Sequence, residues 1–191
     1  FVGTIISPQE GDSTLFVHDL KNNQSLTLKG VNNYTLSPDG NYTVGLIKAP
    51  FAERREARIK KKKADEMPED SLAVIHNHSF GIEKIAGVRS FKTPEKMASH
   101  ITYTITQKTD TTVEKNKSTK PKELLVIRNI ATQHEDTVRN AKEHLFSKFG
   151  NSLAVIIEPD KKDSTGTPGV LFYDLKKNTS TRISNEKAEY K

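Results

Sequence analysis

The sequence repeats one short pattern four times, and this repeat limits the possible folds more than any other feature. Each copy is an apolar strand, a polar turn and a second strand, and the copies begin at Leu15, Leu72, Leu125 and Val170. Their starts are therefore 57, 53 and 45 residues apart. Between copies lies another predicted hairpin, whose clearest turn is Ser-Pro-Asp-Gly at 37–40, because Pro presets φ and Gly accepts a positive φ. Each repeat thus predicts four short strands.

A period of this length with four strands is typical of one blade of a β-propeller. The predicted strands are rich in Val, Ile, Leu, Tyr and Thr, which suit the faces of a sheet. We therefore expect an all-β fold, a partial β-propeller of about three and a half four-stranded antiparallel blades. The expected divisions are a partial blade at 1–30, blades at 31–87, 88–140 and 141–185, and the start of a next blade at 186–191. An ordinary β-sandwich is the alternative.

An arc of this size is too short to close a ring, which usually has about four to eight blades. An open arc would leave blade faces and strand edges unpaired. The first residues, starting at Phe1, also read as the middle of a strand. We therefore expect the natural protein to continue on both sides, or a second copy to complete the arc.

An insertion at 51–70 interrupts the second blade and predicts the one helical element. It consists largely of Ala, Glu, Arg and Lys, which are strong helix formers, and Glu56 and Lys60 are spaced to pair one turn apart. Pro68 is expected to stop the helix after Met67. The apolar residues expected to anchor it to the sheet are Phe51, Ile59 and Met67. The insertion is interpreted as a solvated excursion, with a docking surface for a partner domain as the alternative.

Charge and composition exclude several classes of partner and site. The net charge is +6, but residues 53–70 carry seven basic and six acidic side chains, a mixture that argues against nucleic-acid binding. The polar insertion at 109–122 is expected to form a mobile loop. No stretch approaches the roughly 20 apolar residues of a membrane span. The chain has no cysteine, so disulfides and cysteine-based zinc sites are excluded.

Motifs that carry chemistry were sought, and none indicates a catalytic, cofactor-binding or metal site. The chain lacks the Gly-x-Ser-x-Gly nucleophile elbow, the phosphate loop and the His-Glu-x-x-His zinc helix. Ser13 follows Gly-Asp between two predicted strands, where formation of a turn explains it. His76 and His78 are two residues apart and could face one side of a strand. No third ligand is indicated, so an exposed polar pair is the preferred interpretation.

A propeller enzyme with its site in the central channel would need converging polar side chains from the innermost strands. The candidates are Ser37, Thr93 and Ser147, which occupy equivalent turns of three repeats. Local hydrogen bonding within the turn accounts for them without catalysis.

Five segments together resemble the N-terminal propeller of bacterial prolyl oligopeptidase family serine peptidases, of the type common in Bacteroidetes. The resemblance covers most of the chain, and the basic insertion that ends in Met-Pro-Glu-Asp-Ser-Leu is its most specific part. The segments are Tyr34-Thr-Leu-Ser-Pro-Asp-Gly, Phe51-Ala-Glu-Arg-Arg, Lys60-Lys-Lys-Lys, Met67-Pro-Glu-Asp-Ser-Leu72 and Tyr173-Asp-Leu-Lys-Lys-Asn178.

The resemblance implies a hydrolase in which the propeller covers a C-terminal α/β-hydrolase domain and admits only short peptides. The catalytic triad would lie beyond residue 191, so no family catalytic residue is transferred to this chain. The Glu-Glu pair by which the dipeptidyl-peptidase branch holds a substrate amine is absent here.

The expected function is that of a non-catalytic scaffold and gate in a periplasmic or secreted serine peptidase. Its expected partners are the hydrolase domain of the same parent chain and short peptides. The alternative is a segment of a protein-interaction or periplasmic assembly scaffold with no enzyme attached. A Gly-x-Ser-x-Gly motif downstream of the propeller would decide between them.

Overall fold

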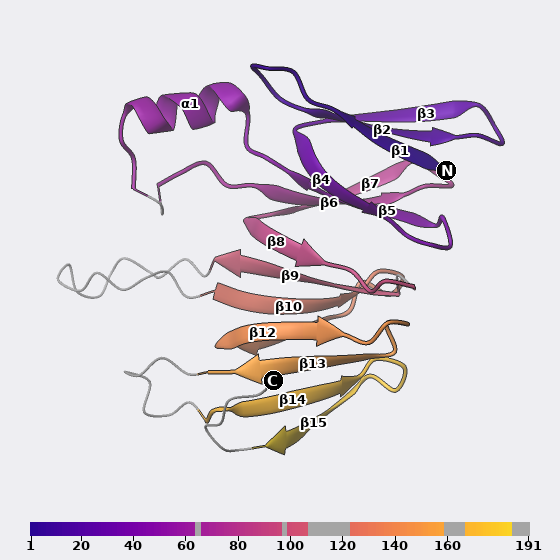
Figure 1. The fold of residues 1–191 in the computed structure, drawn as a ribbon, viewed down its shortest axis with the longest axis vertical. Helices are drawn as coiled ribbons and strands as arrows, with labels where there is room; N and C mark the ends of the chain where they lie inside the picture. The colour runs from indigo at the N-terminus through magenta and orange to yellow at the C-terminus, as the bar shows by residue number, and fades with distance from the viewer. Residues whose placement is uncertain (64–65, 97–98, 107–122, 159–166, 185–191) are drawn as a thin grey trace. The chain divides into compact units, whose positions relative to one another are not determined.

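The computed structural model describes residues 1–63, 66–96, 99–106, 123–158 and 167–184. Within them the chain forms four antiparallel sheets and the helix α1 (Phe51–Ile59). Three sheets have four strands and one has three, so the predicted all-β partial propeller with one helical insertion is confirmed (Figure 1).

The strands follow one another within each sheet in chain order or its reverse. The first sheet contains β1 (Val2–Ile6), β2 (Thr14–Asp19) and β3 (Gln24–Lys29). The second contains β4 (Val31–Leu36), β5 (Tyr42–Ile47), β6 (Ser71–His76) and β7 (Gly81–Ala86). The third contains β8 (Val88–Lys92), β9 (His100–Thr106), β10 (Glu123–Asn129) and β11 (Glu135–Arg139). The fourth contains β12 (Ala141–Phe146), β13 (Ser152–Ile157), β14 (Gly169–Asp174) and β15 (Thr179–Ser184).

The chain forms two compact units, residues 1–91 and 92–191, and each has its own core. The middle strands of the second sheet, β5 and β6, are buried along almost their whole length, whereas the outer strand β15 is largely exposed. In the first unit the core gathers around Leu15, Val17 and Ile75, and in the second around Leu153 and Val155. In the second sheet short apolar strands suffice for burial, because successive residues of β5 and β6 are buried on both faces.

The outer hairpin of every sheet has the same turn. Its last residue adopts a positive φ of 53° to 60°, and the four residues are Asn23, Phe80, Gln133 and Asn178. In three of the four, a side chain at the start of the turn accepts hydrogen bonds from two backbone N–H groups just after it; these residues are Asp19, Asn129 and Asp174. Such turns need only hydrogen bonds between residues close in sequence. This explains why the repeat tolerates sequence variation between copies.

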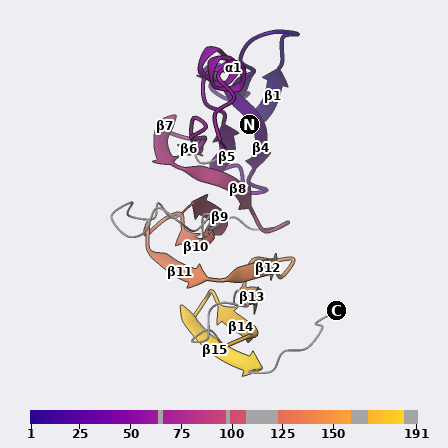
Figure 2. The same cartoon turned by 90° about the vertical axis from the view of Figure 1, so that its left-hand side faces the viewer.

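A single residue of positive φ connects the last strand of one sheet to the first strand of the next. These links are Gly30, Gly87 and Asn140, with φ of 85°, 75° and 58°. Figure 2 shows β11 running directly into β12 through the last of them. The Gly30 N–H donates to Ser13 O at 2.7 Å, and Gly30 O accepts from the Lys48 N–H at 2.8 Å. The link is therefore hydrogen-bonded to chain segments next to β2 and β5.

The predicted helix is shorter than expected, because α1 ends at Ile59 rather than at Met67. The N–H of Lys61 donates to Arg58 O and that of Lys62 to Ala57 O, while Lys61 has a φ of 50°. This is a Schellman motif, in which a lysine takes the left-handed position that Gly usually occupies. Four consecutive lysines add repulsion that disfavours further turns.

The predicted apolar anchors of the helix are also partly wrong. Ile59 is 71% exposed, whereas Ala57 is the buried helix residue. Polar contacts attach the helix instead, because the Phe51 N–H donates to Asp12 Oδ1 at 2.9 Å and Arg54 pairs with the same carboxylate.

Two predicted segments, the insertion at 109–122 and the start of a further blade at 186–191, lie outside the described residues. In the part of the chain that is described, no helix has the length and apolar character that crossing a bilayer requires.

Gly30→Ala should lower the free energy of unfolding by about 2 kcal/mol or more, because non-glycine residues are strained at this φ and the new Cβ would clash. That Cβ would lie 2.9 Å from Ile47 Cγ2 and 3.1 Å from Lys48 O. Urea unfolding measures the change. Asn140→Gly at the equivalent link is the matched control and should leave stability unchanged or slightly higher; equal losses in both variants would contradict this account of the links.

Candidate functional site

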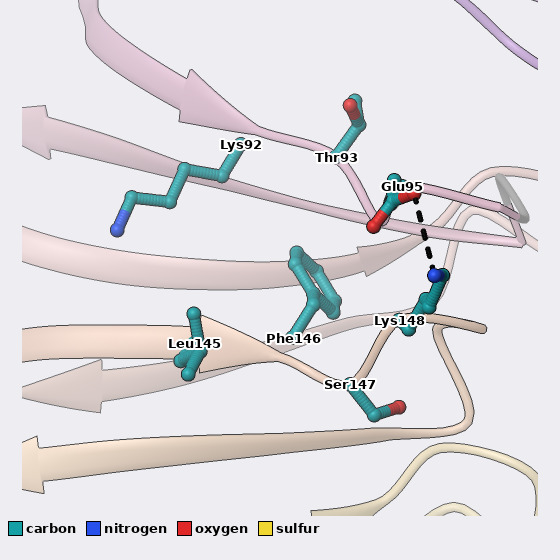
Figure 3. Close-up of a pocket in the computed structure, with 7 residues that line it drawn as sticks. All are labelled: Lys92, Thr93, Glu95, Leu145, Phe146, Ser147 and Lys148. Atoms are coloured by element: carbon teal, nitrogen blue, oxygen red, sulfur yellow. Dashed lines mark ion pairs between the residues drawn. The ribbon is translucent and has the colours of Figure 1, made fainter.

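An open groove in the second unit lies beside two hairpins that are equivalent in the repeat. One side comes from the end of β8 and the segment after it, the other from the end of β12 and its turn. The groove has a volume of about 480 Å³, and the residues that line it are Lys92, Thr93, Glu95, Leu145, Phe146, Ser147 and Lys148 (Figure 3).

The turn after β12 is built by local hydrogen bonds. Ser147 Oγ accepts from the Ser152 N–H at 3.1 Å, and the Gly150 N–H donates to Ser147 O at 2.9 Å. The equivalent turn after β4 is similar, because Ser37 Oγ accepts from the Tyr42 N–H at 2.9 Å. Ser37 and Ser147 therefore act as turn residues, as predicted.

Two contacts hold the sides of the groove together. Lys92 Nζ donates to His144 O at 2.9 Å, and the Lys96 N–H donates to Lys148 O at 2.9 Å. Within this frame the Phe146 ring lies, in the view of Figure 3, between Lys92 and the Glu95–Lys148 ion pair. Hydrogen bonds therefore connect the two sides of the groove at both of its ends.

The surface of the groove combines positive charge with exposed apolar side chains. Glu95 Oε1 lies 3.6 Å from Lys96 Nζ and 3.9 Å from Lys148 Nζ, so one carboxylate faces two ammonium groups. Lys92 also lines the groove and contributes a further positive charge. Leu145 is 73% exposed, which is unusual for a leucine on a strand. Lysines beside apolar side chains suit a ligand that carries both a carboxylate and an apolar group, such as a peptide.

His144 lies on β12 next to the groove. Its Nε2 is 2.9 Å from the hydroxyl of the buried Thr102. Burial, together with the Lys92 ammonium, lowers the pKa of His144 from 6.5 to about 4. The imidazole is therefore neutral at physiological pH and serves as a hydrogen-bonding group.

Another histidine, His100, is buried between Ser99 and Asn129. The distances are 3.1 Å from Nδ1 to Ser99 Oγ and 3.3 Å from Nε2 to Asn129 Nδ2. The Asn129 amide N–H donates a hydrogen bond to Nε2, so the ring proton is on Nδ1. The Nδ1–H group donates a hydrogen bond to the serine hydroxyl. The imidazole therefore cannot accept the proton of Ser99, as nucleophilic catalysis would require.

The sequence candidates outside the groove take structural positions. Ser13 Oγ donates to Val31 O at 2.7 Å, so its hydroxyl connects the segment before β2 to the start of β4. The His76 ring packs on Tyr42 and the His78 ring on Phe1, with centroids 5.1 Å and 5.3 Å apart. These two histidines line a smaller hollow of about 290 Å³ with Asn41, Tyr42 and Ser79. In the described ranges, no group of three or more His, Cys, Asp or Glu side chains is placed to hold a metal ion.

Comparison with known proteins was informative only at the level of structure. No protein-family model matches the chain, and no curated protein matches it. The β-propeller domain of the Trilobed protease from Pyrococcus furiosus is similar over 96% of this chain and 53% of its own, with a TM-score of 0.53 and 11% identity. The chain is part of a β-propeller.

Pyrococcus horikoshii acylaminoacyl peptidase is also similar, with a TM-score of 0.51 and 8% identity over 92% of this chain and 28% of its own. Propellers of prolyl oligopeptidase family peptidases are thus among the similar structures, as the resemblance predicted. The chain spans about half the length of the first and about a quarter of the second. At this identity the similarity establishes the fold, and the Bacteroidetes type stays a prediction.

Thr93 and Ser147 were candidates from the sequence, but the charged and apolar residues around them were not. The repeat itself carries a signal for one of these, Lys148. Where the first turn reads Ser-Pro-Asp-Gly at 37–40, the third reads Ser-Lys-Phe-Gly at 147–150. The third turn thus has a lysine and a phenylalanine where the first has Pro and Asp, which favour a turn. This difference indicates that something other than turn formation constrains the surface there.

The folded state should lose stability between about pH 6.5 and pH 4, because the unfolded chain binds a proton that folded His144 excludes. Above this window the residue is neutral in both states, and below it both states are protonated. His144→Gln should therefore flatten part of the pH dependence measured by urea unfolding. The remainder comes from His100, whose pKa burial also lowers, and from carboxylates whose pKa hydrogen bonds lower, such as Asp39 and Asp174. The control is His134→Gln. An unchanged pH dependence in His144→Gln would contradict the assignment.

Proposed function

We propose that this chain is the non-catalytic propeller portion of a prolyl oligopeptidase-like serine peptidase. In this proposal it supports a C-terminal α/β-hydrolase domain and restricts the access of peptides to it. The observation that carries the proposal is the similarity in fold to the Trilobed protease propeller over 96% of this chain. The proposed location is the periplasm or the exterior of the cell.

The arrangement of the described polar groups supports a role without catalysis. The buried His100 has its acceptor nitrogen occupied by Asn129, and the hydroxyl of Ser147 is used within its own turn. In a propeller the sheets surround a central channel, and the first strand of each blade faces it. The groove beside β8 and β12 would then present its lysines and Leu145 to a peptide that enters.

The first test compares peptidase activity in this chain and in its full-length parent. Short chromogenic peptides should be cleaved by the parent alone, and a serine-directed covalent inhibitor should abolish that cleavage. An inactive parent would favour the alternative, a binding scaffold without an enzyme. Activity in the chain by itself would overturn its non-catalytic assignment.

The gate is tested by narrowing the proposed entrance in the parent. Leu145→Cys, labelled with a bulky maleimide, should reduce the cleavage of long peptides more than that of short ones, because the label occupies the groove. The chain has no cysteine of its own, and the unsubstituted parent treated with the same reagent corrects for labelling elsewhere. Leu20→Cys, in the exposed turn after β2, is the matched control. Equal rates after labelling at the two positions would argue against a gate at this groove.

A further inference from the structure

Helix α1 presents a surface that the propeller fold itself does not require. Figure 1 shows the helix outside the sheets, beyond the ends of β5 and β6. We define its α1 cationic face as the exposed residues Arg55, Arg58 and Ile59. Arg58 and Ile59 follow Arg55 by three and four positions, so the three lie together on the helix surface.

The helix is fixed in place rather than loosely attached. Asp12 Oδ1 accepts from the Phe51 N–H at 2.9 Å and from Arg54 at 3.3 Å, and Arg54 Nε donates to Ala49 O at 2.7 Å. The base of the insertion is closed by an ion pair between Lys48 and Asp70, at 2.6 Å. A surface held in this way loses little conformational entropy when a partner binds.

Acidic and basic residues are mixed along the sequence of the insertion, but in the structure its paired acidic residues contact cations other than the two arginines of this face. Asp70 is engaged by Lys48 and by the Ala49 N–H, and Glu56 pairs with Lys60 one helical turn away. Among the described residues, no carboxylate forms an ion pair with Arg55 or Arg58. The positive charge of the α1 cationic face is therefore not neutralised by these neighbouring acids.

An apolar residue lies within this charged surface. Ile59 is 71% exposed and neighbours the two arginines along the helix. A phosphate backbone offers no apolar group that could cover this side chain. One isoleucine is also little apolar surface for insertion into a bilayer. An acidic protein segment with an apolar side chain complements the face better than either.

We propose that the α1 cationic face docks an acidic segment of a partner protein. Carboxylates of that segment pair with Arg55 and Arg58, and one of its apolar side chains covers Ile59. This interaction is independent of the proposed peptidase function, because it uses the insertion and not the groove.

The test is binding of a fluorescein-labelled peptide, Glu-Asp-Glu-Leu-Asp-Glu-Asp, to the full-length protein, followed by fluorescence anisotropy. Arg55→Glu with Arg58→Glu should weaken binding by about tenfold or more, since two attractive contacts become repulsive. Lys29→Glu with Lys84→Glu makes the same change of net charge on exposed outer strands of the same unit and should weaken binding much less. Ile59→Ser should weaken it by about threefold or more and leave the salt dependence unchanged.

Three results would overturn the proposal. They are failure of the peptide to bind, equal losses in the two charge-reversed variants, and tighter binding to duplex DNA or to phosphatidylserine vesicles than to the peptide. Circular dichroism confirms that each variant is folded. If the reversal disturbs the helix, Arg55→Gln with Arg58→Gln removes the same charges and should still weaken peptide binding.

Discussion

The one-residue link between successive sheets is the constraint on which the rest of this structure depends. Gly30, Gly87 and Asn140 each carry the chain from one sheet into the next within a single positive-φ residue. Their backbone groups are bonded to neighbouring segments, such as Gly30 to Ser13 and Lys48. The last strand of one sheet and the first of the next are therefore joined in a defined way, and a longer link would disturb the register of both.

The candidate groove is a consequence of this repeated geometry combined with a local departure from it. Because β12 repeats β8, the turns that follow them bring Glu95 and Lys148 into contact across the groove. The repeat supplies the shape, whereas Lys148, in the place of a turn-forming residue, adds charge, and Leu145 and Phe146 supply the apolar surface. The repeated pattern thus determines the fold, and residues that differ from one repeat to the next determine the chemistry of the groove.

Much of the fold could be predicted from the sequence because each hairpin is a local structure. Apolar runs with Asn, Asp and Gly at their turns indicate the strands whatever the neighbouring copies do. The end of α1 could not be predicted, since a lysine in the left-handed position leaves no compositional signal. The groove could not be predicted either, because its sides are about fifty residues apart in sequence and meet only after two sheets have formed.

The closed base of the α1 insertion has a consequence for how this chain can change. Link residues leave no room for extra sequence, whereas the connection from β5 to β6 is sealed at its root by Lys48 and Asp70. A segment placed between those two residues leaves the pairing of β5 with β6 unchanged. The insertion can therefore be replaced by another sequence during evolution. A foreign recognition peptide could also be grafted there without redesign of the blade.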